Sequence, residues 1–349
     1  MTIISWLTEH RQSRTKRRRR SAERQNDLYT SLTRSATLFD KEVSSTLKAH
    51  LALFLVNTLY GASHVIAKGV MPTYLTPNVF ILIRALGATF LFWLVKTFYI
   101  KEKIEKKDLF LLAICGLFGV AINQLFFFHG LNLSSSINSG IIMATNPILV
   151  VILSLFILKE RITLKKSLGI MLGTSGAILL TLTAGTGKGD SVLGDTFLFI
   201  NAASYAFYLV LAKPLMKKYS PLTVITYVFT FGVIFVMIYP PTLTDLVSTD
   251  FGSIPSGVWI KIIYVIVGVT FLTYLMTMFG LKFLSPSVSS AYIYIQPVCV
   301  IFFAYFLSSI GVADDYTGTF TLEKVLYMLV IFAGVYITSI GTIREKLRR

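Results

Sequence analysis

Apolar residues dominate the chain after residue 48 and come in ten blocks separated by short stretches rich in Pro, Gly, Asn and charged residues. Each block approaches the roughly 20 residues that an α-helix needs to cross the hydrocarbon core of a bilayer. The pattern predicts an all-α integral membrane protein with ten transmembrane helices in a lipid bilayer. The predicted helices lie near residues 50–69, 79–99, 109–128, 137–158, 167–183, 194–213, 221–239, 259–280, 287–308 and 325–343.

Composition supports a membrane protein. Of the 349 residues 54% are hydrophobic and 14% are charged, whereas soluble domains carry about 25% charged residues. The two cysteines, Cys115 and Cys299, lie inside apolar blocks, which indicates neither a disulfide framework nor a metal site. No phosphate-binding loop is present, so the sequence predicts no cofactor.

Residues 1–48 form a tail of a different kind, polar and basic, with the run "RTKRRRR" and no apolar core of a signal peptide. A solvated, disordered tail is the simpler interpretation, and attraction to anionic lipid is the alternative. Nucleic-acid binding is not predicted.

Positive charge sets the orientation. Most of the 33 lysines and arginines fall in the tail, at alternate junctions between blocks, and at the C-terminus, residues 344–349. Because cytoplasmic loops carry excess Lys and Arg, both termini are predicted to be cytoplasmic. The predicted location is the plasma membrane, which in a bacterium is the inner membrane.

The second half of the chain repeats the first. The stretch "GLNLSSSINSGIIMATNP" at 130–147 aligns without a gap with "GLKFLSPSVSSAYIYIQP" at 280–297. A second pair aligns "ITLKKSLGIMLGTSGAI" with "FTLEKVLYMLVIFAGVY". Five helices per half is an odd number, so the halves, 49–183 and 190–343, must insert in opposite orientations. Inverted repeats of this kind are typical of secondary transporters.

Four stretches carry a resemblance to a known family: "YGASHVIAK", "VFILIRALGATFLF", "NPILVVILSLFILKERITLKKSLG" and "NAASYAFYLVLAK". Over residues 50–343 the chain resembles the EamA-type family of the drug/metabolite transporter superfamily. The resemblance implies transport of an amino acid or related small metabolite. Tyr60 stands where the family often has Trp, and the acidic motif at Glu160 has no counterpart in the second half.

A polar stripe runs through the first apolar block. Asn57, Tyr60, His64 and Lys68 are spaced three, four and four residues apart, which places them on one helical face. An uncompensated ionisable group at mid-bilayer costs at least about 2.5–3.5 kcal/mol, so the first three are predicted to line a substrate cavity. Structural hydrogen bonds between helices are the alternative. Lys68 is expected to reach the interface, and His64 is the candidate for proton coupling because its pKa lies near working pH.

Two prolines occupy equivalent positions of the repeats. Pro147 and Pro297 each follow an amide residue, Asn146 or Gln296, and each is predicted to break its helix. Irregular backbone at membrane depth is tolerated where it lines a cavity, so both amides are cavity candidates. A kink needed only for packing is the alternative.

The remaining cavity candidates are polar side chains in the middle of predicted helices: Asn123, Asn201, Tyr205, Tyr208, Tyr274 and Tyr292. For Arg84 the sequence favours pairing with helix-end carbonyls over binding a carboxylate or phosphate. The glycines Gly169, Gly173 and Gly176 predict a close-packing face within one bundle. No carboxylate falls mid-helix.

These features predict a secondary transporter that exports amino acids or related small molecules by alternating access, as a monomer or weak homodimer. A passive facilitator is the alternative. A membrane enzyme is much less favoured, because no nucleophile–base pair is present and no catalytic residue can be named.

Overall fold

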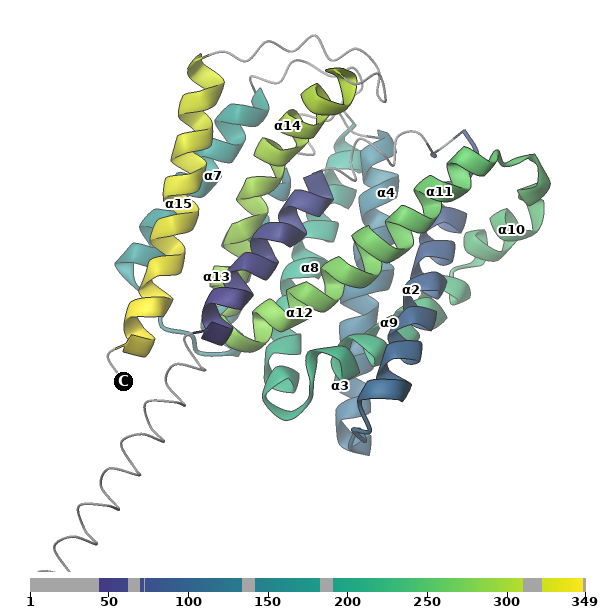
Figure 1. The fold of residues 1–349 in the computed structure, drawn as a ribbon, viewed down its shortest axis with the longest axis horizontal. Coiled ribbons are helices and arrows are strands. Elements are labelled where there is room, and N and C mark those ends of the chain that lie inside the picture. The colour runs from purple at the N-terminus through teal and green to yellow at the C-terminus, as the bar shows by residue number, and fades with distance from the viewer. Residues whose placement is uncertain are drawn as a thin grey trace, which may run out of the picture. The chain divides into compact units, whose positions relative to one another are not determined.

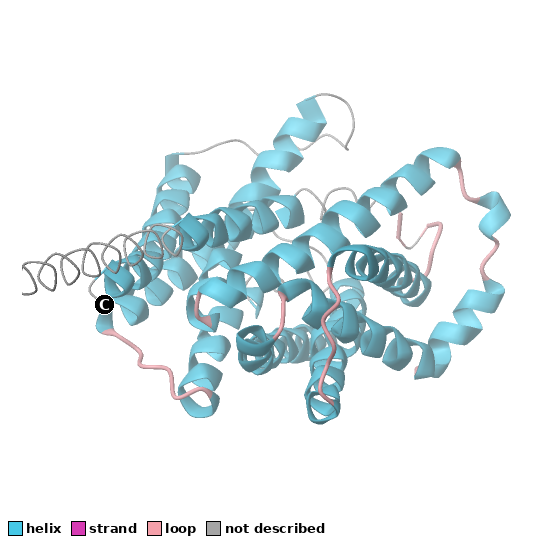
Figure 2. Ribbon diagram, turned by 60° about the horizontal axis from the view of Figure 1, so that its bottom comes forward, coloured by secondary structure: helices cyan, strands magenta, loops and turns pink. Residues whose placement is uncertain are grey.

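The computed structural model describes residues 44–61, 70–71, 73–133, 142–182, 191–309 and 322–347, and the elements within them are helices joined by loops (Figure 2). The chain divides into two units, Met1–Leu47 and Lys48–Arg349. All packing described below lies within the second unit. His64 and Lys68 lie outside the described residues.

The first described helix covers residues 44–61. The other elements of the described ranges are α2 Pro77–Tyr99, α3 Lys106–Gly116, η1 Leu117–Ile122, α4 Asn123–Leu133, α6 Asn146–Ile157, α7 Leu164–Leu182, α8 Val192–Lys218, α9 Pro221–Ile238, α10 Pro240–Ser248, η2 Phe251–Ser253, α11 Ser256–Tyr264, η3 Val265–Leu272, α12 Thr273–Phe283, α13 Pro286–Ala291, η4 Tyr292–Ile295, α14 Gln296–Ser309 and α15 Leu322–Leu347. The segments η1 and η3 are π-helical, and η2 and η4 are 3₁₀-helical.

Local sequence signals set the starts of α2 and α9. Each follows a hydroxyl residue, Thr76 or Ser220, whose side chain accepts a hydrogen bond from the backbone N–H three residues on, at 3.4 Å and 3.2 Å. The next residue is Pro77 or Pro221. Proline suits this first position because its φ is already helical and its missing N–H would have had no partner.

Five described helical segments are long and apolar enough to cross a membrane: Pro77–Tyr99, Lys106–Leu131, Val192–Lys218, Pro221–Ile238 and Ser256–Phe283. They confirm the prediction of a helical membrane protein. The predicted spans near 50–69 and 137–158 run partly through residues outside the described ranges, and the one near 287–308 is divided among α13, η4 and α14. Those near 167–183 and 325–343 correspond to α7 and α15, which are not among the five segments. Ten spans therefore stay a prediction.

Large apolar side chains face outward on several of the described helices. Phe98 and Phe156 are each 75% exposed, and Ile260 is 69% exposed. Such side chains would be unfavourable in water, but hydrocarbon is as apolar as they are. The outer surface therefore suits contact with lipid.

Glycines bring α7 and α15 together, and Figure 1 shows the two helices running side by side. A Cβ atom on Gly334 of α15 would lie 2.5 Å from the backbone nitrogen of Gly173 and 2.7 Å from the carbonyl oxygen of Gly169. Gly176 faces Ile331 in the same way. The predicted close-packing face is confirmed, and its partner lies within the same chain.

Candidate functional site

Four tyrosines form the centre of the candidate site, and we call Tyr60, Tyr205, Tyr208 and Tyr274 the tyrosine cluster. They come from the first helix, α8 and α12. The rings of Tyr205 and Tyr208 have centroids 5.9 Å apart. Tyr208 is fully buried and its hydroxyl donates to Met278 Sδ at 3.4 Å. The sequence predicted these tyrosines as cavity residues on separate helices, and the fold brings the helices together.

Tyr274 links α12 to the helix formed by α3, η1 and α4. Its hydroxyl donates to the carbonyl oxygen of Gly119 at 3.4 Å and accepts from Gln124 Nε2 at 3.3 Å. The amide oxygen of Gln124 is buried and has no partner among the described residues. On the other side of α12, Thr273 Oγ1 lies 3.1 Å from the hydroxyl of Tyr60. A buried acceptor that the described residues leave unused, the amide oxygen of Gln124, therefore lies beside the tyrosine cluster.

Amide side chains extend the site along the first helix, α6 and α8. Gln296 Nε2 donates to Asn57 Oδ1 at 2.9 Å. Asn146 Nδ2 donates to the carbonyl oxygen of Ala202 at 2.7 Å. Each bond joins two helices, so these amides stabilise the bundle in the arrangement seen here.

The candidate Asn123 takes part through its backbone. Its carbonyl oxygen accepts from Asn201 Nδ2 at 2.6 Å. Nearby, Ser204 Oγ donates to the carbonyl oxygen of Phe118. Phe118 and Gly119 both lie in η1, where the i→i+5 pattern disturbs the regular ladder and leaves carbonyl oxygens for side chains. Sequence reasoning missed these acceptors, since nothing in the apolar run marks a π-helical segment.

Both predicted helix breaks fall at helix starts. α6 begins at Asn146 and α14 begins at Gln296, so Pro147 and Pro297 each occupy the first turn of a new helix. A turn precedes α6 and the 3₁₀ segment η4 precedes α14. Each amide residue is therefore the first residue of its helix, and the backbone N–H of Gln296 donates to the carbonyl oxygen of Ile293 in η4.

Tyr292 has a different neighbour from the other candidate tyrosines. Its hydroxyl lies 2.7 Å from His50 Nδ1, and the two ring centroids are 5.9 Å apart. The sequence did not single out His50, because it stands next to the basic tail. The fold pairs the two residues between the first helix and η4.

Arg84 lies in α2, is 8% exposed, and does not have the contacts that the sequence favoured. Its Nε donates to Thr270 Oγ1 at 3.3 Å rather than to helix-end carbonyls. Its guanidinium carbon lies 6.0 Å from the ring centroid of Phe80 and 5.5 Å from that of Phe128. Two aromatic rings on α2 and α4 therefore hold the charged group against η3.

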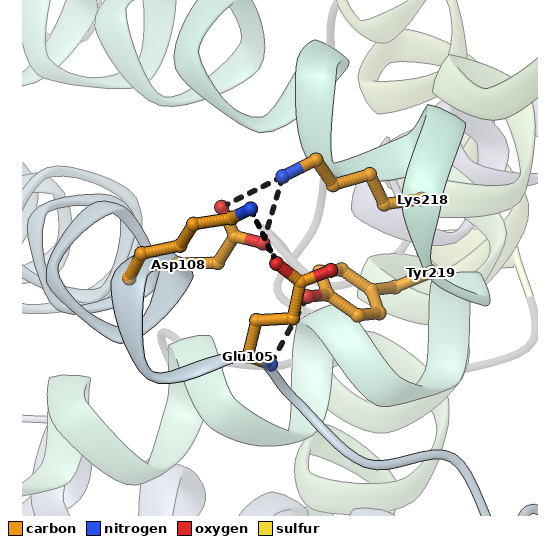
Figure 3. Close-up of polar contacts among 5 residues, drawn as sticks. Glu105, Asp108, Lys218 and Tyr219 are labelled. Atoms are coloured by element: carbon orange, nitrogen blue, oxygen red, sulfur yellow. Dashed lines mark hydrogen bonds and ion pairs between the residues drawn. The ribbon is translucent and has the colours of Figure 1, made fainter.

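A second polar network joins the start of α3 to the end of α8 (Figure 3). Lys218 Nζ lies 2.9 Å and 3.1 Å from the two carboxylate oxygens of Asp108. The hydroxyl of Tyr219 donates to Asp108 Oδ2 at 2.7 Å and accepts from the backbone N–H of Glu105 at 3.1 Å. Burial raises the pKa of Tyr219, so its phenol stays a donor.

We expect Tyr219→Phe to lower the free energy of unfolding by about 1–2 kcal/mol, because Asp108 and the Glu105 amide both lose a partner. The exposed Tyr239, 38% accessible, provides the control Tyr239→Phe. Because the folded-state pKa is raised, the contribution of Tyr219 is present below about pH 10 and is lost as pH rises further. Thermal unfolding in detergent measures both variants, and equal melting temperatures would contradict the bonding role.

Comparison with known proteins places this fold among transporters. The family model described as the EamA-like transporter family matches residues 47–182 and 192–340. The uncharacterized transporter YetK of Bacillus subtilis (strain 168) is 26% identical over 306 residues, which are 85% of this chain and 88% of that protein. The uncharacterized transporter YyaM of the same organism is 31% identical over 216 residues, 61% of this chain and 70% of that one.

A plant protein and a solved structure are also similar to this chain. The WAT1-related protein At4g30420 of Arabidopsis thaliana is 26% identical over 201 residues, 48% of this chain and 54% of that protein. A solved crystal structure with 18% identity has a TM-score of 0.66 and covers 85% of this chain and 99% of its own. At that identity the match shows the fold alone.

Proposed function

Because this chain belongs to the EamA-like transporter family, as its sequence motifs indicated, we propose that it is a secondary transporter exporting an amino acid or a similar amphiphilic metabolite by alternating access. The family establishes an integral membrane transporter. The substrate class, the outward direction and the mechanism are the proposal.

The observation that carries the proposal is the hydrogen bond between Gln124 and Tyr274. The two residues occupy equivalent positions of the two repeats, in the aligned stretches that lead to Gly130 and Gly280. Equivalent residues of two repeats meet where the pseudo-two-fold axis passes between them. This contact supports an inverted repeat whose axis runs through the tyrosine cluster, and transporters with such repeats bind substrate at the repeat interface.

Two further features occur at equivalent positions of the two repeats. Asn146 of α6 bonds to α8, and its counterpart Gln296 of α14 bonds to the first helix, which is the counterpart of α8. The π-helical segments η1 and η3 fall at equivalent places in the third helix of each half. These correspondences also support two halves that rock about a shared centre.

The side chains in and around the tyrosine cluster support an amphiphilic substrate. The tyrosine cluster offers aromatic faces and hydroxyls, and Gln124 and Asn146 each keep an amide oxygen without a partner in the described structure. Buried polar groups without partners are costly, which favours a role in holding a ligand. In the present arrangement the other polar groups bond to one another across helices.

The test is uptake of labelled amino acids into proteoliposomes of the full-length protein, with and without an imposed pH gradient. We expect gradient-driven uptake, and uptake about tenfold lower in Tyr274→Phe, because the bond joining the repeats is lost, a change of about 1.4 kcal/mol. Tyr239→Phe is the matched control and should transport normally.

His64→Ala separates the two mechanisms. Loss of the gradient effect in this variant would support proton coupling through the first helix. Uptake that ignores both the gradient and the substitution would favour a passive facilitator. No uptake of any amino acid by the parent protein would refute the proposed substrate class.

A further inference from the structure

We infer that Arg84 recognises a carboxylate group of the transported molecule. This inference rests on the proposed function and adds the residue that selects for an anionic group. It begins from the charge of Arg84, which is buried inside the helix bundle and is not balanced by any ion pair in the described structure.

The guanidinium has more hydrogen-bonding capacity than the protein uses. Its five N–H donors form a planar fork that matches a carboxylate. Within the described ranges one donor, Nε, has a side-chain acceptor, Thr270 Oγ1 at 3.3 Å. The rings of Phe80 and Phe128 stabilise the charge from its faces. Among the described residues none accepts from the two terminal NH₂ groups, which leaves them for a ligand.

Three carboxylates of the described helices and their junctions are engaged by other residues. Asp108 pairs with Lys218, and Glu160 pairs with Lys166 at 2.8 Å. Asp245, the acidic residue of α10, accepts from Asn78 at 2.9 Å. A molecule entering the site would therefore meet a cation whose charge the neighbouring side chains leave unmatched.

The second repeat shows that the fold itself does not need this charge. Counted from the prolines that open their helices, Pro77 of α2 and Pro221 of α9, the counterpart of Arg84 is Val228. Val228 is fully buried. The same architecture is thus completed by an aliphatic side chain in one half and by a guanidinium in the other. A purely structural position would not require the difference.

An independent observation supports a ligand beside Arg84. Thr270, which accepts a hydrogen bond from Arg84 Nε, lies one turn before Tyr274 on the same helix. The hydroxyl of Tyr274 accepts a hydrogen bond from the amide nitrogen of Gln124. The unused oxygen of that amide is a buried acceptor. A cation and an orphaned acceptor that contact residues one turn apart on the same helix, Thr270 and Tyr274, fit a molecule that carries both a carboxylate and a hydrogen-bond donor.

The single charge favours a carboxylate over a phosphate. The other polar side chains described around Arg84 are Thr270, Tyr60 and Tyr274, all of them uncharged in their ordinary state. One guanidinium balances one negative charge, and a doubly charged phosphate would leave a buried excess.

The experiment compares each amino acid that is transported with its amide, which lacks the negative charge. Competition for uptake and thermal stabilisation are measured for the parent protein, Arg84→Lys, Arg84→Val and the control Tyr239→Phe. We expect the acid to bind the parent and the control about 10- to 100-fold more tightly than the amide. Arg84→Val should remove this preference, and Arg84→Lys should keep part of it, because it retains the charge without the fork.

The outcomes separate the two claims. If the parent protein transports acid and amide equally, or if both Arg84 variants keep the full preference, the inference is overturned and the proposed function stands. If the parent transports neither, the proposed function fails and the inference fails with it. Should Arg84→Val not fold, as judged by gel filtration, Arg84→Lys decides.

Discussion

Gly334→Ala is expected to destabilise the protein, whereas Gly257→Ala is expected to leave it unchanged or slightly more stable. A Cβ at Gly334 would lie 2.5 Å from the nitrogen and 2.8 Å from the Cα of Gly173, and both atoms are backbone. No side-chain rotation can relieve that clash, so α7 and α15 must separate. Overpacking of this kind costs about 1–3 kcal/mol or more.

Gly257 provides the matched control because it is also helical, and a Cβ there meets nothing within 4 Å. In that position alanine should gain about 0.5–1 kcal/mol through its better helix propensity. The two variants are therefore expected to change the free energy of unfolding in opposite directions. Thermal unfolding in detergent, followed by fluorescence, measures both, and equal shifts would show that α7 and α15 do not pack as closely as described.

Glu160→Gln is expected to destabilise the protein by about 3 kcal/mol, because it leaves a buried lysine without its partner. Glu160 Oε1 lies 2.8 Å from Lys166 Nζ, with the side chains 12% and 10% exposed. The other carboxylate oxygen accepts from Ser287 Oγ at 3.0 Å. Lys159, whose φ of 52° turns the chain after α6, brings Glu160 into this position.

Two comparisons make the Glu160 result decisive. The pair between Lys107 and Glu105 is shorter, at 2.6 Å, but the side chains are 70% and 55% exposed, so solvent screens it and Lys107→Met should leave the melting temperature nearly unchanged. The double variant Glu160→Gln/Lys166→Met removes the orphaned charge and should recover much of the lost stability. A double variant as unstable as Glu160→Gln would place the effect in Ser287 instead.

Helix positions were predictable where they depend on local sequence. The apolar block at 79–99 became α2, Pro77–Tyr99, and the two additional residues follow from the hydroxyl–proline start. The glycine stripe of α7 indicated close packing because small side chains leave room on any helix face. The family resemblance rests on the same local stretches.

Features that depend on facing helices were not predictable. The partner of Arg84 was wrongly assigned, because Thr270 is 186 residues away and only the fold places it opposite. The predicted helix at 287–308 contains the 3₁₀ segment η4 just before Pro297; the sequence predicted a break there but not its form, in which the Gln296 N–H donates to the carbonyl oxygen of Ile293. Gln124 is a polar residue in an apolar run, which the sequence shows. Its bond to Tyr274 depends on how the two repeats pack against each other, which the sequence does not show.

The π-helical segments have a mechanical consequence. Each is a place where a helix carries a surplus residue relative to the regular i→i+4 ladder. Displacing it past a residue would rotate that residue by about 100° and shift it by about 1.5 Å along the axis. Tyr274 and Gln124 are each the second residue after the end of η3 and η1. The two side chains that join the repeats could thus be turned away from each other while both ends of their helices stay fixed.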